Sequence, residues 1–97
     1  MGESTVLQSH DIITIARHFR LQWEEAQQAY VLLYPEGMVT LNESAGEILN
    51  RCQYETSVAD IVTELQQEFE DDSIAADVRE FLEAAYANGW ISAKRPG

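Results

Sequence analysis

The sequence predicts an α+β fold in which a three-stranded antiparallel β-meander is followed by a bundle of three helices. Two periodicities support this prediction. Apolar and polar residues alternate through residues 19–41, with turn-forming residues between the runs, which is typical of short strands. From Ala45 onward the apolar residues recur three and four positions apart, which is typical of amphipathic helices. A length of 97 residues suits one compact domain.

The meander is predicted from the segments FRLQWEE, QAYVLLY and MVTL, separated by three-residue connections at 25–27 and 35–37. If both connections form simple hairpins, each strand faces its neighbour in one definite register, and one face of the sheet is wholly apolar. The predicted pairs are Trp23 with Ala29, Leu21 with Val31, Phe19 with Leu33, Leu33 with Val39, and Val31 with Leu41.

The opposite face of this meander is more apolar than a solvated face requires, so we expect another segment to cover it. One candidate is the preceding stretch VLQSHDIITIARHF, with Ile12, Ile13 and Ile15, from the same chain or from a second copy; a partner surface is the other. The large side chains predicted on this face are Tyr30, Leu32, Tyr34 and Met38.

The first two helices each show an apolar stripe behind a residue that can cap the helix start. The first is capped by Asn42, or by Ser44 with Glu47 as a capping box, and the second by Ser57. The stripes are Ala45, Ile48, Leu49 and Cys52 in the first helix, and Val58, Ile61, Val62, Leu65 and Phe69 in the second.

The third helix is expected to start at Asp72 or Ser73 and to stop at Asn88-Gly89, because glycine readily takes the left-handed conformation that ends a helix. Trp90 and Ile91 are then predicted to return to the core as a plug or a short strand. The stripe of this helix is Ile74, Val78, Phe81, Leu82 and Ala85.

The charge balance excludes some partners. Six Lys and Arg stand against 17 Asp and Glu, a formal net charge of −11, whereas nucleic acid or an anionic membrane requires a basic surface. The helical part, residues 42–91, holds most of the acids. The chain shows no signal-peptide pattern and no run of apolar residues near the ~20 that a membrane span needs, so we expect a cytoplasmic protein. Cys52 is the only cysteine, and we expect it to be buried.

The sequence offers little for catalysis. His10 and His18 have no metal-ligand spacing, and phosphate-binding or nucleophile motifs are absent. The pairs Glu24-Glu25 and Asp71-Asp72 fall at a turn and beside a helix start, where carboxylates are usually solvated or interact with the helix dipole. We therefore predict no catalytic residue, no metal ligand and no cofactor. A small acid/base enzyme would instead need a concave site with perturbed carboxylates.

A peptide-binding site is the clearest functional candidate. In the predicted meander MVTL is an edge strand, and its unpaired backbone groups can join an extended peptide. Because Asn42 leads directly into a helix, a groove can form between this edge and a helix packed behind it. The alternative is an edge that the preceding arm or a second subunit covers.

Three linked features resemble the PqqD family, pyrroloquinoline quinone (PQQ) biosynthesis protein D. They are a tyrosine-bearing hairpin with Pro-Glu-Gly, the Leu41-Asn42 junction into A-x-x-I-L, and the ending from Phe81-Leu82 to Gly89-Trp90. The resemblance covers roughly residues 17–91. It divides the chain into an arm (1–16), which is flexible, covers the sheet or is exchanged in a dimer, a PqqD-like domain (17–91) and a tail (92–97).

The resemblance implies a winged-helix-like, non-catalytic peptide chaperone. Its client would be the precursor peptide PqqA, bound by strand addition and presented to the radical SAM enzyme PqqE. The implied peptide-binding residues are Met38, Val39, Thr40 and Leu41 on the third strand, and Asp77, Val78, Phe81 and Leu82 on the third helix.

Two alternatives stay open beside the small enzyme. A winged-helix DNA-binding or regulatory module has a similar order of strands and helices, although Arg51 and Arg79 are the only bases across the three predicted helices. A homodimer, with the edge strand or the outer face of the meander occupied, is compatible with the peptide-binding interpretation and would affect when the peptide can bind.

Overall fold

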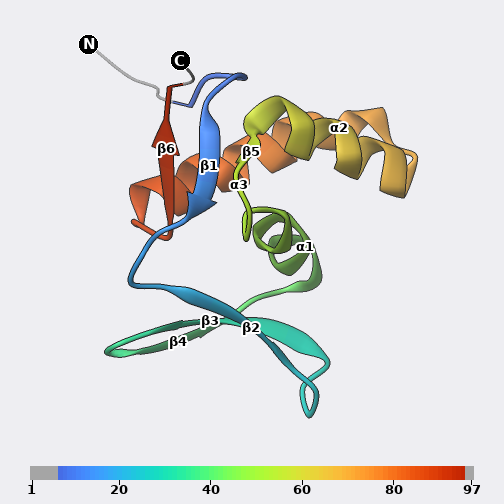
Figure 1. Cartoon of the computed structure of the whole chain (residues 1–97). Helices are drawn as coiled ribbons and strands as arrows, with labels where there is room; N and C mark the ends of the chain where they lie inside the picture. The colour runs from blue at the N-terminus through green and yellow to red at the C-terminus, as the bar shows by residue number, and fades with distance from the viewer. Residues whose placement is uncertain (1–6, 96–97) are drawn as a thin grey trace.

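The computed structural model describes residues 7–95. It confirms the predicted α+β class, with two three-stranded antiparallel sheets and three helices. Figure 1 shows α1 between the sheet β2–β3–β4 on one side and α2 and α3 on the other. In chain order the elements are β1 (Ile12–Ile15), β2 (Arg20–Glu24), β3 (Ala29–Tyr34), β4 (Gly37–Thr40), α1 (Glu43–Arg51), β5 (Thr56–Ser57), α2 (Val58–Phe69), the 3₁₀ turn η1 (Asp72–Ile74), α3 (Ala75–Ala87) and β6 (Ile91–Lys94).

The predicted meander is confirmed as the sheet β2–β3–β4, but its predicted register is wrong in both hairpins. The observed register opposes Trp23 to Tyr30 and Leu32 to Val39, and no predicted pair is found. The first connection, residues 25–28, is one residue longer than predicted and ends at Gln28 in the left-handed region, with φ 53°. The second, residues 35–36, is one residue shorter, because Gly37 already pairs with Tyr34.

The first hairpin is shifted by one residue in one direction and the second by one residue in the other. The two shifts cancel between β2 and β4, so only the side chains of the middle strand, β3, change faces. Strands β2 and β4 keep their predicted faces, whereas Leu32 and Tyr30 of β3 turn toward the helices instead of the outer face. Leu32 is fully buried in the core, and Tyr30 packs against it. Met38 stays on the outer face, where it is half exposed, beside Leu33 of β3.

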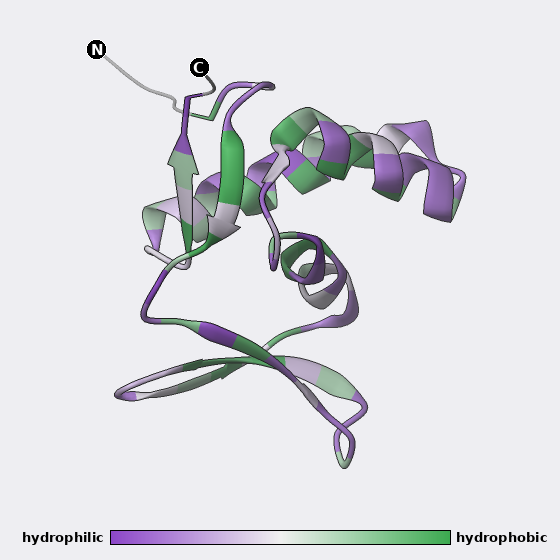
Figure 2. Ribbon diagram, viewed as in Figure 1, coloured by the Kyte–Doolittle hydropathy of each residue, from purple (hydrophilic) through white to green (hydrophobic). Residues whose placement is uncertain are grey.

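The segment that was expected to cover the meander forms part of a second sheet. Strand β1 lies at its centre, between β5 and β6, and pairs Ile13 with Thr56 on one side and with Ala93 on the other. The expected return of the chain after Trp90 is confirmed as β6, which packs on α3 and continues to Lys94. Figure 2 shows that β1 is largely hydrophobic, in keeping with its central place in this sheet, where Ile13 is fully buried and the other three residues are partly buried.

A buried carboxylate links the start of β1 to the end of β6, at one end of the second sheet. Asp11, which is 3% exposed, accepts a hydrogen bond from the Gln8 backbone N–H at 2.8 Å. Its other oxygen lies 3.1 Å from Nε of Arg95, beyond the end of β6. Because a buried carboxylate is stable only when it is paired, this contact ties the chain before β1 to the chain after β6.

The helix starts are largely as predicted from their capping residues. Asn42 caps α1 by accepting from the Ala45 N–H at 2.8 Å, and Ser57 caps α2 by accepting from the Asp60 N–H at 3.0 Å. The prediction for the third helix is wrong: Asp71, and not Asp72 or Ser73, provides the cap, and it caps the 3₁₀ turn that leads into α3. That helix ends at Ala87 with Asn88 as its C-cap, and Gly89 follows with φ 79°, as expected for a glycine stop.

The predicted stripes of the helices meet in one core. Its fully buried members include Leu49 of α1, Ile61 and Leu65 of α2, and Leu82 of α3. Helix α1 approaches the meander so closely that a Cβ atom added at Gly46 would lie 2.8 Å from Cδ2 of Tyr30. Glycine therefore sets the distance between the first helix and the sheet.

Replacing Gly46 with alanine tests this close contact. Alanine favours helix by up to about 1 kcal/mol relative to glycine, but forcing an extra carbon into a packed contact costs about 1–3 kcal/mol. We expect Gly46→Ala to lower the free energy of unfolding by roughly 1 kcal/mol in urea denaturation. In a Tyr30→Leu background the same change should be neutral or stabilising. A Gly46→Ala protein more stable than the wild type would contradict the contact.

Cys52, the C-cap of α1, is fully buried, as predicted. Burial raises the pKa of its thiol to about 12, and Sγ lies 3.4 Å from the Ile48 carbonyl oxygen. The folded state therefore binds this proton more tightly than the unfolded state, whose thiol ionises near the ordinary value of about 8.5. Stability should fall as the pH rises from about 9 toward 12, and part of this fall should be absent from a Cys52→Ala variant.

The same burial predicts slow alkylation of Cys52 in the folded protein. Iodoacetamide labelling at pH 8, followed by mass spectrometry, should be slow without denaturant and fast in urea, because the thiolate is the reactive form. Equal labelling rates in the two conditions would mean that the thiol is accessible in the native state.

Candidate functional site

The last strand of the meander presents an open edge. Within residues 7–95, strand β4 pairs only with β3, and the Leu41 N–H donates to the Tyr30 carbonyl at 3.0 Å. Backbone groups of an antiparallel strand alternate in direction, so those of Val39 also face β3, whereas those of Met38 and Thr40 face away from the sheet. We call these outward groups the β4 edge. An extended chain can pair with them.

A mostly apolar groove opens where the three helices meet, and we call it the helix groove. It has a volume of about 400 Å³ and adjoins the start of α1, the end of α2 and the first half of α3. Its floor is formed by buried stripe residues of all three helices. These are Ala45 and Ile48 of α1, Leu65 of α2 and Val78 of α3. The lining residues are Asn42, Ser44, Ala45, Ile48, Leu65, Phe69, Asp71, Ile74, Asp77, Val78 and Phe81.

The eight predicted peptide-binding residues fall into three groups. The structure brings Asp77, Val78 and Phe81 together in the helix groove, although Val78 is 4% exposed and is a core residue that also lines the groove. Met38, Val39 and Thr40 lie on β4 and do not line this groove. Leu41 and Leu82 are core residues, with exposures of 5% and 0%.

The helix groove also contains residues outside the eight predicted peptide-binding positions. Asn42 connects it to β4, and Phe69 is 48% exposed at the end of α2. Phe69 belongs to the predicted core stripe, but it is the last residue of α2 and does not join the core. An aromatic residue at the end of a stripe, followed at once by Glu70, Asp71 and Asp72, was a signal that it would stand at the surface.

The acids at the mouth of the groove differ in their environment. Asp71 accepts hydrogen bonds from the Ser73 hydroxyl at 2.6 Å and from the Ser73 backbone N–H at 2.9 Å. These bonds stabilise the ionised form and lower the pKa of Asp71. Asp71 is thus a capping carboxylate that stays charged, whereas Asp77 is exposed in the first turn of α3.

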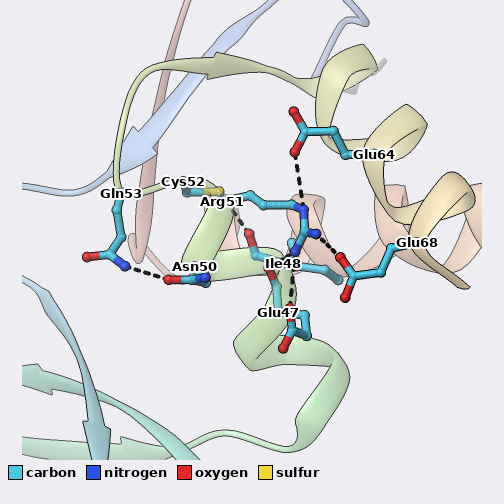
Figure 3. Close-up of polar contacts among 8 residues, drawn as sticks. All are labelled: Glu47, Ile48, Asn50, Arg51, Cys52, Gln53, Glu64 and Glu68. Atoms are coloured by element: carbon cyan, nitrogen blue, oxygen red, sulfur yellow. Dashed lines mark hydrogen bonds and ion pairs between the residues drawn. The ribbon is translucent and has the colours of Figure 1, made fainter.

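Arg51 holds two walls of the groove in place. It extends from the end of α1 and forms ion pairs with Glu47 of its own helix and with Glu64 and Glu68 of α2 (Figure 3). Burial lowers the pKa of Arg51, but the hydrogen bonds to Glu47 and Glu68 outweigh this effect and raise it. The guanidinium therefore fixes α1 relative to α2 next to the groove residues Ile48 and Leu65.

The described residues show no assembled chemical centre. Both histidines, His10 and His18, are exposed, and residues 7–95 contain no group of three or more His, Cys, Asp or Glu side chains that could hold a metal ion. No helix in the same range is long and apolar enough to span a membrane. What the geometry offers is an open strand edge and an apolar groove, joined at Asn42.

Three comparisons with known proteins agree with the resemblance. The family model for coenzyme PQQ synthesis protein D (PqqD) matches residues 29–91. The PqqA binding protein of Azotobacter vinelandii is 50% identical over 92 residues, which cover 94% of this chain and 97% of that protein. The PqqA binding protein of Methylococcus capsulatus is 47% identical over 85 residues, covering 88% and 91%.

The fold is also similar to a solved structure. The solution NMR structure of the PqqD truncation of Methylobacterium extorquens PqqCD superposes with a TM-score of 0.74 and 26% identity, covering 91% of this chain and 96% of the other. That protein is described as a functional, stand-alone recognition element for a ribosomally synthesized and post-translationally modified peptide. On the family model, the curated relatives and the shared fold together, this chain belongs to the PqqD family.

Proposed function

We propose that this protein is a non-catalytic peptide chaperone of PQQ biosynthesis that binds the precursor peptide PqqA and presents it to the radical SAM enzyme PqqE. Its curated relatives are named PqqA binding proteins, and its structural relative is described as a peptide recognition element. The client is ribosomally made, so the encounter would take place in the cytoplasm. The observation that carries the proposal is the open β4 edge, which leads at Asn42 into the helix groove.

The peptide would bind as a fourth strand of the meander. Its backbone would pair with the outward groups of Met38 and Thr40, while Val39 and Leu41 support β4 from the core side. Beyond Asn42, apolar side chains of the peptide would enter the helix groove against Val78 and Phe81, with Asp77 at its mouth. Leu82, which is fully buried, would act only by supporting α3.

Strand addition of this kind predicts a moderate affinity. Each backbone hydrogen bond contributes about 0.5–1.5 kcal/mol net to the binding free energy. Ordering a flexible peptide segment offsets about 2–5 kcal/mol of the favourable interaction energy. A few such bonds, with burial of some apolar side chains, give a dissociation constant on the order of micromolar. A chaperone must also release its client, and binding of this strength permits transfer.

The alternative functions have less support. In a DNA-binding module the helices would need free bases, but Arg51 is occupied by three glutamates. In an acid/base enzyme a groove carboxylate would need a raised pKa to donate a proton near neutral pH, and that of Asp71 is lowered.

Thr40→Pro tests strand addition at the β4 edge. Proline removes the Thr40 N–H, which points away from β3, so every bond between β3 and β4 is retained. We expect the variant to keep its fold by circular dichroism and to bind PqqA about tenfold more weakly in isothermal titration calorimetry. Thr40→Val, which keeps the N–H, is the matched control and should bind normally.

An NMR titration with PqqA, and with an unrelated acidic peptide of equal length, locates the contact. Shifts should cluster on residues 38–41 and on α3 with PqqA only. Unchanged PqqA affinity in a folded Thr40→Pro variant would place the peptide elsewhere. The same samples should be checked for mass in solution, because a homodimer that uses this edge would have to open before the peptide binds.

Docking to PqqE is expected to depend on the charge of the helices. Residues 42–91 hold twelve acids and two bases, and Glu80 and Glu83 are exposed on α3. We expect these acids to face a basic patch on the enzyme, so that raising NaCl from about 0.05 M to 0.5 M weakens the complex in pull-down or biolayer interferometry. A Glu80→Gln/Glu83→Gln variant should lose part of this salt dependence. Docking that is indifferent to salt would refute the charge hypothesis.

A further inference from the structure

A second hollow lies beside the junction between β4 and α1, and it differs from the helix groove in composition. It has a volume of about 320 Å³ and combines two aromatic rings with two carboxylates. We call it the aromatic–acidic pocket. Its lining residues are Trp23, Gln28, Ala29, Tyr30, Leu41, Asn42, Glu43 and Glu47.

The aromatic side of this pocket is held in a fixed arrangement. Trp23 and Tyr30 are opposed across β2 and β3, and their rings pack edge to face with centroids 5.1 Å apart. The indole Nε1–H of Trp23 donates to Glu25 Oε1 at 3.0 Å, and Glu25 also accepts from the Gln28 side chain. Although it is held in this way, Trp23 is 45% exposed. A large aromatic ring is thus oriented at the surface before any ligand arrives.

The acidic side of the pocket comes from the first two turns of α1. Glu47 shares its carboxylate with Arg51, at 3.2 Å from Nη1. Glu43 is exposed and makes no ion pair with any residue from 7 to 95. Among the residues that the structure describes, no lysine or arginine lines the pocket. Aromatic faces and carboxylates both attract cations, so the chemistry of the pocket is complementary to an ammonium or guanidinium group.

The pocket is continuous with the proposed peptide path. A shallow hollow of about 410 Å³, lined by Asn42, Glu43, Ser44 and Phe69, adjoins both the helix groove and the aromatic–acidic pocket. Asn42 lines all three. Side chains of a peptide paired with the β4 edge can therefore enter either of two hollows at the end of that strand, the helix groove or the aromatic–acidic pocket. One accepts apolar side chains and the other accepts a positive charge.

We propose that the aromatic–acidic pocket binds a lysine or arginine side chain of the client peptide, with Trp23 and Glu43 as its main contacts. This inference rests on the proposed function and adds a determinant of specificity to it. The strand edge pairs with any extended backbone, whereas the pocket selects peptides that carry a positive side chain at one end of the paired segment.

The test compares PqqA with a neutralised PqqA in which every lysine is acetylated and every arginine is replaced by citrulline. With the wild-type protein the neutralised peptide should bind about three- to tenfold more weakly. Glu43→Gln should weaken the binding of PqqA by a similar factor and should have little effect on the neutralised peptide. The matched control, Glu83→Gln, removes one exposed acid of α3 and should weaken both peptides equally or not at all.

Tryptophan fluorescence gives an independent measure of contact. PqqA should change the emission of the wild-type protein, and a Trp23→Phe variant should lose that component, leaving only the response of Trp90. If the two peptides bind equally well and Glu43→Gln behaves as Glu83→Gln does, the pocket inference is wrong and the proposed function stands. If neither peptide binds, both the proposed function and the inference are overturned.

Discussion

The short junction between strand β4 and helix α1, formed by Leu41 and Asn42, constrains the rest of the molecule. The Leu41 N–H makes the last bond of the meander, and Asn42 then caps α1 through its side chain, while its carbonyl accepts from the Gly46 N–H at 2.9 Å. Helix α1 must therefore start at the edge of the sheet, and its second turn must lie against the middle strand. Only a residue without a side chain fits there, because Tyr30 fills the space above Gly46. The hollows proposed to bind the peptide surround this junction, so the same residues determine the fold and the site.

The acidic helices need a counter-charge inside the fold, and Arg51 supplies it. A single exposed ion pair contributes little, but one guanidinium shared by three carboxylates orders several side chains around a group that is itself largely buried. This arrangement holds α1 to α2 while Glu43 and the three acids of α3 make no ion pair within the described residues. Part of the charge that stays free lies beside the peptide path, at Glu43 and Asp71, and on α3, at Asp77, Glu80 and Glu83, where a binding partner can use it.

Much of this fold could be predicted from local sequence signals. Asn42, Ser57 and Gly89 act within one turn of chain, so single residues were enough to place helix ends. The register of the meander was not predictable in the same way, because it depends on whether Gln28 adopts a left-handed conformation and on where Gly37 begins to pair. The two errors cancelled for β2 and β4, which left the predicted edge strand with its correct faces. The sheet formed by β1, β5 and β6 was missed as a unit, because its strands come from three distant parts of the chain and only the folded state brings them together.

The site was harder to predict than the fold, because a small domain uses the same helices for its core and for binding. Val78 lies on a core stripe and also lines the helix groove, whereas Leu82, four residues later on the same stripe, is fully enclosed. Spacing along a helix cannot separate these two positions, since both point toward the interior. What separates them is where the neighbouring elements end: α1 starts and α2 stops beside Val78, and the core is open there. The groove therefore exists because of where α1 starts and α2 ends. Lengthening or shortening these helices would change the groove, and with it peptide selectivity, while the apolar stripes stayed the same.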